Sequence, residues 1–323
     1  MKLVPTTTED AIKKARSREN IRLLYIAGAG RSGSTLLSSV LGEGDGVCNV
    51  GEVQRIWERG ILEKGLCGCA KTVEECQFWQ ETFNAAFDEG INSVNIEEMV
   101  RVVNTLVRMR NIISLLLKIK LNKFSDNERI CLQQLEKLYV AIYEQHPERI
   151  IIDASKYPSY ALLLSHVLKL DVFVVHLTRN PFAVAYSWGR KKFNPDRKAN
   201  MKNMSAFKST FVWVSWNLFL QVLCSVIYGR KYMQMKYSSF IDNPNNELSR
   251  LENFLDRENI FTRFDKNREM SVAVQHTIAG NPMRFEGERM KLKYDDNWVK
   301  NISPVQKIFV HIVSWPWRKF LGY

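Results

Sequence analysis

Cysteine is scarce in this chain, which argues against a protein held together by disulfides. The sequence has 323 residues and six cysteines, too few for a disulfide scaffold in a chain of this length. A secretory signal is also missing, because residues 1–20 are mostly polar and contain no apolar run. Both observations predict a protein of the reducing cytoplasm.

Internal repeats and low-complexity segments are absent too, which excludes solenoids, propellers and disordered chains. Apolar residues make up 46% and charged residues 25%, the usage of a folded protein. Negative charge is in deficit, because 46 Lys and Arg outnumber 34 Asp and Glu for a net charge of +12. This balance favours an anionic partner, such as a nucleotide, a sulfated or phosphorylated substrate, nucleic acid or a membrane surface.

One uncharged segment, residues 209–229, is long enough to span a bilayer. Asn217, Gln221 and Ser225 interrupt it at spacings of four, so they form a polar stripe along one helix face. The stripe favours a buried helix of a large α/β domain over a transmembrane span. Peripheral contact with a membrane surface stays open.

Short apolar runs alternate with helical patterns along the chain. Residues 21–28, 149–153 and 171–178 are expected strands, and residues 232–237 are a weaker one. Apolar strands that alternate with helices predict a parallel sheet covered on both faces. The long stretch between the first two strands predicts a helical insertion or lid at residues 57–147, within a single domain of residues 1–323.

The insertion has helical periodicity at residues 95–124 and 128–145. Its first part is basic, with Arg101, Arg108, Arg110, Lys118, Lys120 and Lys123. These side chains either form an ordinary solvated helix face or bind an anionic acceptor or lipid headgroups.

A glycine-rich loop, GAGRSGST, follows the first expected strand and opens a helix. Its backbone N–H groups and the helix N-terminus form a natural cradle for an anion. The glycine spacing matches that of P-loop NTPases, but Ser34 occupies the position of the lysine that contacts the β- and γ-phosphates. Arg31 supplies a cation inside the loop instead.

The loop GRSGSTLL resembles the segment that binds the 5′-phosphosulfate in sulfotransferases using 3′-phosphoadenosine 5′-phosphosulfate (PAPS). A second motif, VVHLTRNPFAVAYSW, is similar to their 3′-phosphate site, with Arg179, Pro181 and Ser187 at the matching positions. The resemblance, to bacterial carbohydrate-type and tyrosylprotein-type members, implies a P-loop-like three-layer sandwich with a central parallel sheet.

Two later segments fit the same resemblance. MKYSSFIDNP is similar to the family's late strand, which implies that Tyr237 lies near the adenosine. HTIAGNPMRF is similar to a loop that closes over the nucleotide, which implies that Arg284 lies near the 3′-phosphate. The residues that the resemblance assigns to the donor are Gly30, Arg31, Ser32, Gly33, Ser34, Thr35, Arg179, Ser187, Tyr237, Asn281 and Arg284.

Sulfuryl transfer requires a base for the acceptor and cations where negative charge develops. Glu52, in CNVGEVQR, resembles the glutamate that acts as the base in tyrosylprotein and some carbohydrate sulfotransferases. Arg31 and Lys156 are the expected cations, Lys156 at the carboxyl end of a strand. The resemblance implies transfer to an acceptor hydroxyl on a glycan, a lipid or a small molecule, with no metal required.

Rival functions and sites remain beside this hypothesis. Against a P-loop kinase or NTPase, this sequence lacks the Walker lysine and an evident magnesium aspartate. Against a non-catalytic nucleotide- or polyanion-binding module, it lacks RNA-reading motifs. Nucleic acid is therefore not an expected partner. Cys67, Cys69 and Cys76, with Cys48, suggest zinc, but paired C-x-x-C ligands and a following histidine are missing. The cysteine stretch is expected to pack as a lid over the acceptor site.

Overall fold

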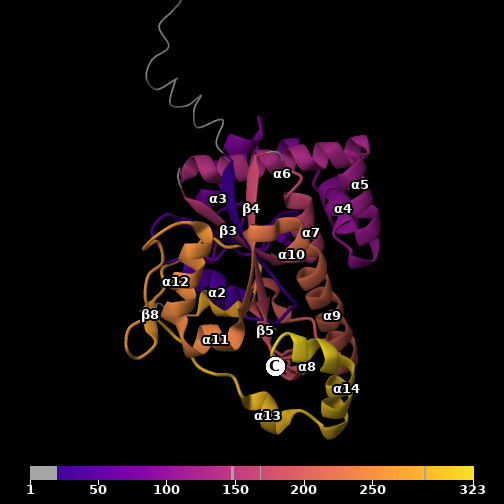
Figure 1. Ribbon diagram of the computed structural model, residues 1–323. Helices are drawn as coiled ribbons and strands as arrows, with labels where there is room; N and C mark the ends of the chain where they lie inside the picture. Colours follow the sequence, from indigo (N-terminus) through magenta and orange to yellow (C-terminus); the bar gives the residue numbers. More distant parts are fainter. Residues whose placement is uncertain (1–19, 147–148, 168, 287–288) are drawn as a thin grey trace, which may run out of the picture.

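The computed structural model describes residues 20–146, 149–167, 169–286 and 289–323, and its centre is a five-stranded parallel sheet (Figure 1). The strand order is β2-β3-β1-β4-β7, and every neighbouring pair is parallel. The strands are β1 Ile21–Ala27, β2 Val47–Gly51, β3 Ile150–Lys156, β4 Leu170–Thr178 and β7 Tyr232–Lys236. The predicted α/β class is confirmed, while the polar start of the chain lies outside the described residues.

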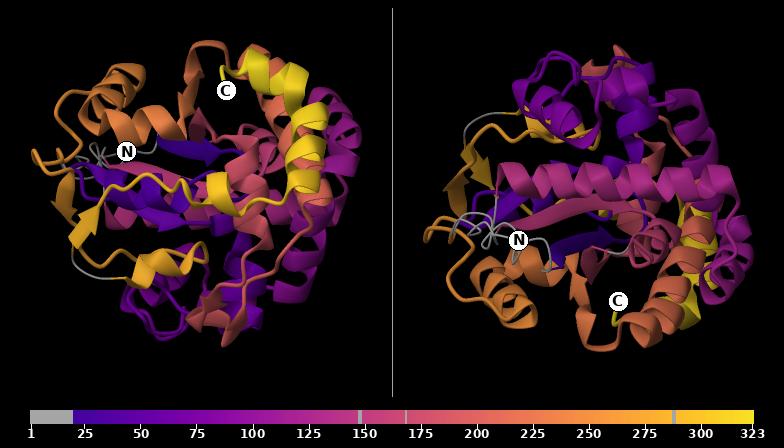
Figure 2. Two further views of the ribbon diagram at one scale, coloured as in Figure 1. Left: turned by 90° about the horizontal axis from the view of Figure 1, so that it is seen from below. Right: turned by 90° about the horizontal axis from the view of Figure 1, so that it is seen from above.

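Helices cover both faces of the sheet, which gives the predicted P-loop-like sandwich of three layers (Figure 2). Side chains alternate along β1, because successive residues of a strand point to opposite faces. Leu23 and Tyr25 pack with helices α6 and α7, whereas Leu24 and Ile26 pack with α2 and α12. These helices are α2 Ser34–Leu41, α6 Asp126–Gln145, α7 Pro158–Leu164 and α12 Pro244–Leu255.

The edge strand β2 is a difference from the expected set of strands. Its sequence VCNVG contains asparagine and glycine, which strands disfavour. It becomes a strand by pairing with β3, with Val47 opposite Ile150 and Cys48 opposite Ile151. This pairing brings the residue after β2, Glu52, to the carboxyl edge of the sheet.

The helical segment between β2 and β3 contains α3 Gln77–Ala86, α4 Ile96–Leu106, α5 Ile112–Leu121 and α6. The expected helix at residues 95–124 is two helices, separated by a short 3-10 turn at Met109–Asn111. Ser125 and Glu128 form a capping box that begins α6. On the basic part of the segment, Lys118 pairs with Glu128 at 2.7 Å.

After β4 the chain forms further helices, the last sheet strand β7 and two small antiparallel strand pairs. The helices are α8 Pro181–Gly189, α9 Ala206–Phe219, α10 Ser225–Tyr228, α11 Tyr237–Asp242, α13 Asn297–Asn301 and α14 Pro304–Phe320. The strand pairs are β5 Phe193–Asn194 with β6 Ala199–Asn200, and β8 Glu269–Ser271 with β9 Arg289–Lys291.

The uncharged segment forms α9, which a π-helical turn joins to α10. Its polar stripe faces the sheet, because Asn217 Oδ1 lies 2.7 Å from His176 Nε2 on β4. By length and composition the helix Ala206–Lys231 passes as a membrane span, with a mean hydropathy of 1.6, but 33% of that window is buried. The expected burial therefore holds for one side of the helix: Asn217, Trp213 and Leu220 are buried, whereas Phe211, Val222 and Val226 are exposed. His176 is a hydrogen-bonded core residue, as expected.

Candidate active site

The glycine-rich loop joins β1 to α2 and opens towards a cavity. Arg31 and Gly33 have φ angles of 71° and 98°, in the left-handed region, so the loop turns tightly into α2. The N-terminus of a helix attracts anions, because its first N–H groups are free and its dipole is positive there. Thr35, in the first turn, accepts a hydrogen bond from the Asn281 N–H at 3.1 Å. The loop and the late segment are thus held together.

Arg31 is the cation of this loop. Its guanidinium lies 4.8 Å from the ring centre of Trp188, and Nη1 lies 3.2 Å from Met201 Sδ. Its Nε is buried without a hydrogen-bond partner among the described residues. Burial lowers the pKa of Arg31, and the Glu52 carboxylate opposes this shift. An anion in the cavity would satisfy both the free N–H and the charge.

Glu52 and Lys156 form an ion pair beside the loop, although 104 residues separate them. Glu52 follows β2, and its backbone N–H donates to the Ile278 carbonyl at 2.8 Å. Lys156 ends β3 with a φ of 73°. Arg55, the partner that sequence proximity suggests for Glu52, instead pairs with Glu58 at 2.7 Å.

Arg179 leaves the carboxyl end of β4, next to the loop. Its Nη1 donates to the Arg31 carbonyl at 3.1 Å, and its guanidinium lies 4.5 Å from the ring centre of Tyr237. Asp295 is its acidic partner, at 3.3 Å. Ser187 lies further along α8 and shares a cavity wall with Arg179. The two residues expected at the 3′-phosphate, Arg179 and Ser187, therefore line the same cavity.

A single cavity of about 570 Å³ collects most of these side chains. This size is in the range of small-molecule sites, about 300–1,000 Å³. The expected site residues that line it are Gly30, Arg31, Gly33, Ser34, Thr35, Glu52, Lys156, Arg179, Ser187, Tyr237 and Asn281. Ser32 is buried behind the loop and does not line it.

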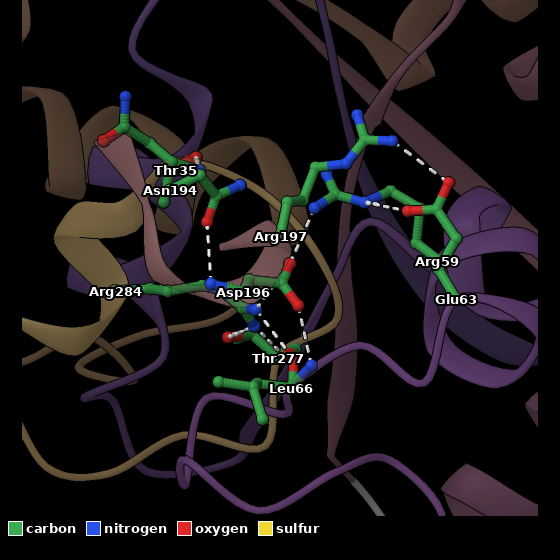
Figure 3. A network of polar contacts seen from close by, with 10 residues as sticks. Thr35, Arg59, Glu63, Leu66, Asn194, Asp196, Arg197, Thr277 and Arg284 are labelled. Atoms are coloured by element: carbon green, nitrogen blue, oxygen red, sulfur yellow. Dashed lines mark hydrogen bonds and ion pairs between the residues drawn. The ribbon is translucent and has the colours of Figure 1, made fainter. Parts of the chain in front are cut away.

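Arg284 lies apart from this cavity, in a polar network beneath the lid (Figure 3). Its Nη2 donates to the Leu66 carbonyl at 2.7 Å and lies 3.4 Å from Asp196. Asp196 also pairs with Arg59 at 2.7 Å and accepts from the Leu66 N–H at 2.7 Å. In this structure Arg284 holds the lid segment, and its guanidinium is not beside Arg179.

Several cavity residues have no signal in the sequence. Tyr157 and Trp216 form one wall, with ring centres 4.8 Å apart, and Arg55 Nη2 donates to the Tyr157 hydroxyl at 2.6 Å. Trp188 and Met201 add apolar surface next to Arg31. These residues come from separate elements, so only the fold brings them together.

The chain resembles known proteins over most of its length. Residues 24–262 match the model of a family described as the sulfotransferase family. Solved structures that resemble it include the sulfotransferase domain from the curacin biosynthetic pathway, at 17% identity, with 92% of this chain and 98% of that chain covered and a TM-score of 0.48. No curated protein matches the chain.

Two further solved structures cover less or share fewer residues. Sulfotransferase STF9 from Mycobacterium avium is 12% identical, with 76% of this chain and 66% of that chain covered and a TM-score of 0.41. Mouse sulfotransferase SULT7A1 complexed with PAP is 10% identical, with 95% and 88% covered and a TM-score of 0.42.

Proposed function

This chain belongs to the sulfotransferase family, and we propose that it transfers the sulfuryl group of PAPS to a hydroxyl of an acceptor. The observation that carries the proposal is one cavity in which the glycine-rich loop, the Glu52–Lys156 pair and Arg179 meet. Groups suited to phosphate thus line the same cavity as a carboxylate, that of Glu52.

The loop amides and the N-terminus of α2 are suited to the 5′-phosphosulfate. Arg179 and Ser187 are suited to the 3′-phosphate, and a guanidinium offers two parallel hydrogen bonds to one phosphate. Tyr237, whose ring lies against Arg179, is suited to the nucleoside. The donor carries anionic groups at its 5′ and 3′ positions, and two cations that line the cavity, Arg31 and Arg179, are suited to them.

In the proposed reaction Glu52 accepts the proton of the acceptor hydroxyl, whose oxygen forms a new bond to sulfur. The bond from sulfur to the bridging oxygen of the donor breaks, and 3′-phosphoadenosine 5′-phosphate (PAP) leaves with that electron pair. Arg31 and Lys156 stabilise the negative charge that develops on the bridging oxygen. The Glu52–Lys156 ion pair supports this division of roles, because it holds base and cation next to each other.

The chemistry does not resemble that of a P-loop kinase. Ser34 takes the place of the Walker lysine, and Asp153 on β3 is fully buried and accepts from the Tyr139 hydroxyl at 2.5 Å. Its carboxylate therefore faces the core and is not offered to magnesium. We expect transfer to proceed without added magnesium, which a kinase requires.

The experiment that tests this function is incubation of the purified chain with sulfur-labelled PAPS and a panel of glycans, lipids and phenols, without added magnesium. Transfer of label to an acceptor supports the proposal. Magnesium-dependent hydrolysis of ATP without label transfer would restore the kinase. The aromatic wall of Tyr157 and Trp216 favours acceptors with an apolar or ring-shaped face.

A further inference from the structure

Three cysteines of the lid and a histidine of the late loop meet outside the cavity described above, so the cysteine stretch does not line that cavity as a cover of the acceptor site. The metal-binding atoms of Cys67, Cys69, Cys76 and His276 all lie within 4.8 Å of one another. The histidine comes from 200 residues beyond Cys76, so the sequence spacing that argued against zinc does not apply. All the cysteines are free thiols.

The distances within the cluster suit a tetrahedral metal ion. With zinc–sulfur bonds of about 2.3 Å, two sulfur ligands lie about 3.7 Å apart. Cys69 Sγ lies 3.6 Å from Cys76 Sγ, and His276 Nδ1 lies 3.7 Å from Cys67 Sγ and 3.2 Å from Cys76 Sγ. Three sulfurs and one nitrogen form a complete ligand set for a structural zinc ion.

Neighbouring groups hold the four side chains in this arrangement. Trp79 Nε1 donates to the His276 carbonyl at 3.1 Å, and the Phe78 ring stacks on the imidazole with centres 5.1 Å apart. The Cys67 N–H donates to the Lys71 carbonyl at 2.8 Å, which closes a tight loop around Cys69.

We propose that Cys67, Cys69, Cys76 and His276 bind a structural zinc ion that joins the lid to the late loop of the active site. The loop runs on from His276 through Ile278, whose carbonyl accepts from the Glu52 N–H, to Asn281 on the cavity wall. The ion would therefore fix the backbone that holds Glu52 and closes the nucleotide site. The proposal does not depend on which reaction the site performs.

Metal analysis of the reduced full-length chain tests the site directly. We expect close to one zinc per chain, and binding of cobalt(II) to the zinc-free chain with the visible spectrum of a tetrahedral thiolate site. Cys69→Ser should lose most of the bound metal. Cys48→Ser, at a free cysteine on β2 outside the cluster, should keep it.

The cobalt titration of the wild-type chain needs no variant, so a failure of Cys69→Ser to fold leaves the test intact. A reduced wild-type chain that contains no zinc and gives no tetrahedral cobalt spectrum would overturn the proposal. So would a disulfide between Cys69 and Cys76 in the freshly purified chain, because these sulfurs would then be unable to bind the ion.

A second surface is independent of the metal cluster. α9 and α14 pack side by side, with the rings of Phe207 and Phe309 4.4 Å apart, and α5 lies on the same side of the molecule (Figures 1 and 2). The solvent-facing stripes of these helices are apolar. Their exposed members are Ile113, Leu117, Leu121, Phe207, Phe211, Leu218, Val222, Val226, Val305, Ile308, Ile312 and Trp315.

On this surface, which we call the apolar face, the usual pattern of a soluble helix is inverted: polar residues are buried and apolar residues are exposed. On α9 the polar Asn217 is fully buried, while Val226, after the π-helical turn, is 79% exposed. On α14 the hydroxyl of Ser314 is buried and Ile312 is 67% exposed. Soluble monomers rarely expose such continuous apolar area, and it marks contact with a protein or a membrane.

The charges on these helices select a membrane as the partner. α5, α9 and α14 contain no aspartate or glutamate. Their charged residues are Lys118, Lys120, Lys208, Lys307, Arg318 and Lys319. Exposed apolar residues on helices that contain lysine and arginine but no acidic residue are the pattern of helices that lie in an anionic bilayer surface. We infer that the apolar face docks on anionic lipid headgroups.

Sedimentation with phospholipid vesicles tests the apolar face. We expect the wild-type chain to pellet with vesicles containing phosphatidylglycerol, less with phosphatidylcholine alone, and less as salt rises. The double variant Val226→Asp, Ile312→Asp should stay in the supernatant. Val274→Asp, at a valine that is 70% exposed outside the apolar face, should still pellet.

Two results would overturn this second proposal. One is a wild-type chain that stays in the supernatant with anionic vesicles. The other is a stable dimer in analytical ultracentrifugation that the double variant dissociates, because a second copy would then cover the apolar face.

Discussion

At the scale of single residues, ion pairs and hydrogen bonds position the charged side chains of the site. Glu52 and Lys156 are 104 residues apart in the sequence, yet their side chains pair where the neighbouring strands β2 and β3 end. Arg31 and Arg179 are linked through the carbonyl of Arg31. Substitutions of Glu52 and of Arg179 should therefore have different effects on turnover and on nucleotide affinity.

Glu52→Gln should lower turnover by about 10²–10⁴-fold, because a general base typically contributes that much. Affinity for PAP should change only a few fold, since the base acts on the acceptor and not on the donor. Steady-state kinetics and calorimetry measure the two effects. Glu58→Gln, at a glutamate that lines the same cavity and pairs with Arg55, is the control and should keep near-normal turnover. Near-normal turnover of Glu52→Gln would show that the base is elsewhere.

Arg179→Ala should weaken PAP binding far more than AMP binding, because only PAP has a 3′-phosphate. A lost charge-assisted contact costs about 1.5–3 kcal/mol, which is roughly 10- to 150-fold in affinity. Titration calorimetry with both nucleotides decides it. Equal affinity of the wild-type chain for PAP and AMP would contradict the assignment of Arg179.

At the scale of elements, a buried carboxylate connects the lid with the rest of the fold. Asp196 lies between β5 and β6 and contacts Arg59 of the segment after β2, Leu66 of the lid and Arg284 of the late loop. Arg284 is 3% exposed, so its charge depends on this partner. The network explains why Arg284 has a structural role that the motif did not predict.

Asp196→Asn should lower the free energy of unfolding by about 3 kcal/mol, because removing one partner of a buried pair leaves a charge uncompensated. Glu63→Gln is the matched control, since Glu63 is 39% exposed and pairs with Arg59 and Arg197 at the surface. It should cost under about 1 kcal/mol. Urea denaturation compares the two. Equal effects would mean that Asp196 does not hold the lid.

At the scale of the whole molecule, two buried groups in the central sheet give stability opposite pH dependences. Burial lowers the pKa of His176 from 6.5 to about 4, so the unfolded chain binds this proton first and acid destabilises the fold. Burial raises the pKa of Asp153 from 3.8 to about 6, so the folded chain binds that proton first and acid stabilises the fold. Between these values the two effects oppose each other.

His176→Gln should remove the contribution of His176 to the pH dependence of stability. The stability of the wild-type chain relative to the variant should fall by up to about 1.4 kcal/mol for each pH unit between pH 6.5 and about 4, because only the wild-type chain must keep a neutral histidine. Chemical denaturation at several pH values measures the difference. A difference that is constant with pH would mean that His176 keeps its ordinary pKa in the fold.

The sequence by itself determined the class of fold, the glycine-rich loop and most of the predicted site residues that the structure brings to one cavity. These features are local: apolar strands alternate with helices, and a loop's glycines, Arg31 and Ser34 lie within a few residues. The Arg179 and Ser187 segment is local in the same way. Short stretches of sequence are therefore enough to show the anion cradle, and the resemblance of the two motifs to sulfotransferases adds the expected roles of Arg179 and Ser187.

Only the tertiary structure decided the partners of these residues. The short strand β2 exists because β3 pairs with it, and this pairing sets Glu52 beside Lys156. His276 completes a cluster with cysteines some 200 residues earlier in the chain, and Arg284 is drawn to Asp196 and away from the cavity. Such contacts depend on which elements the core brings together. A buried charged or polar group must be paired, and its partner is whichever group the packing places next to it.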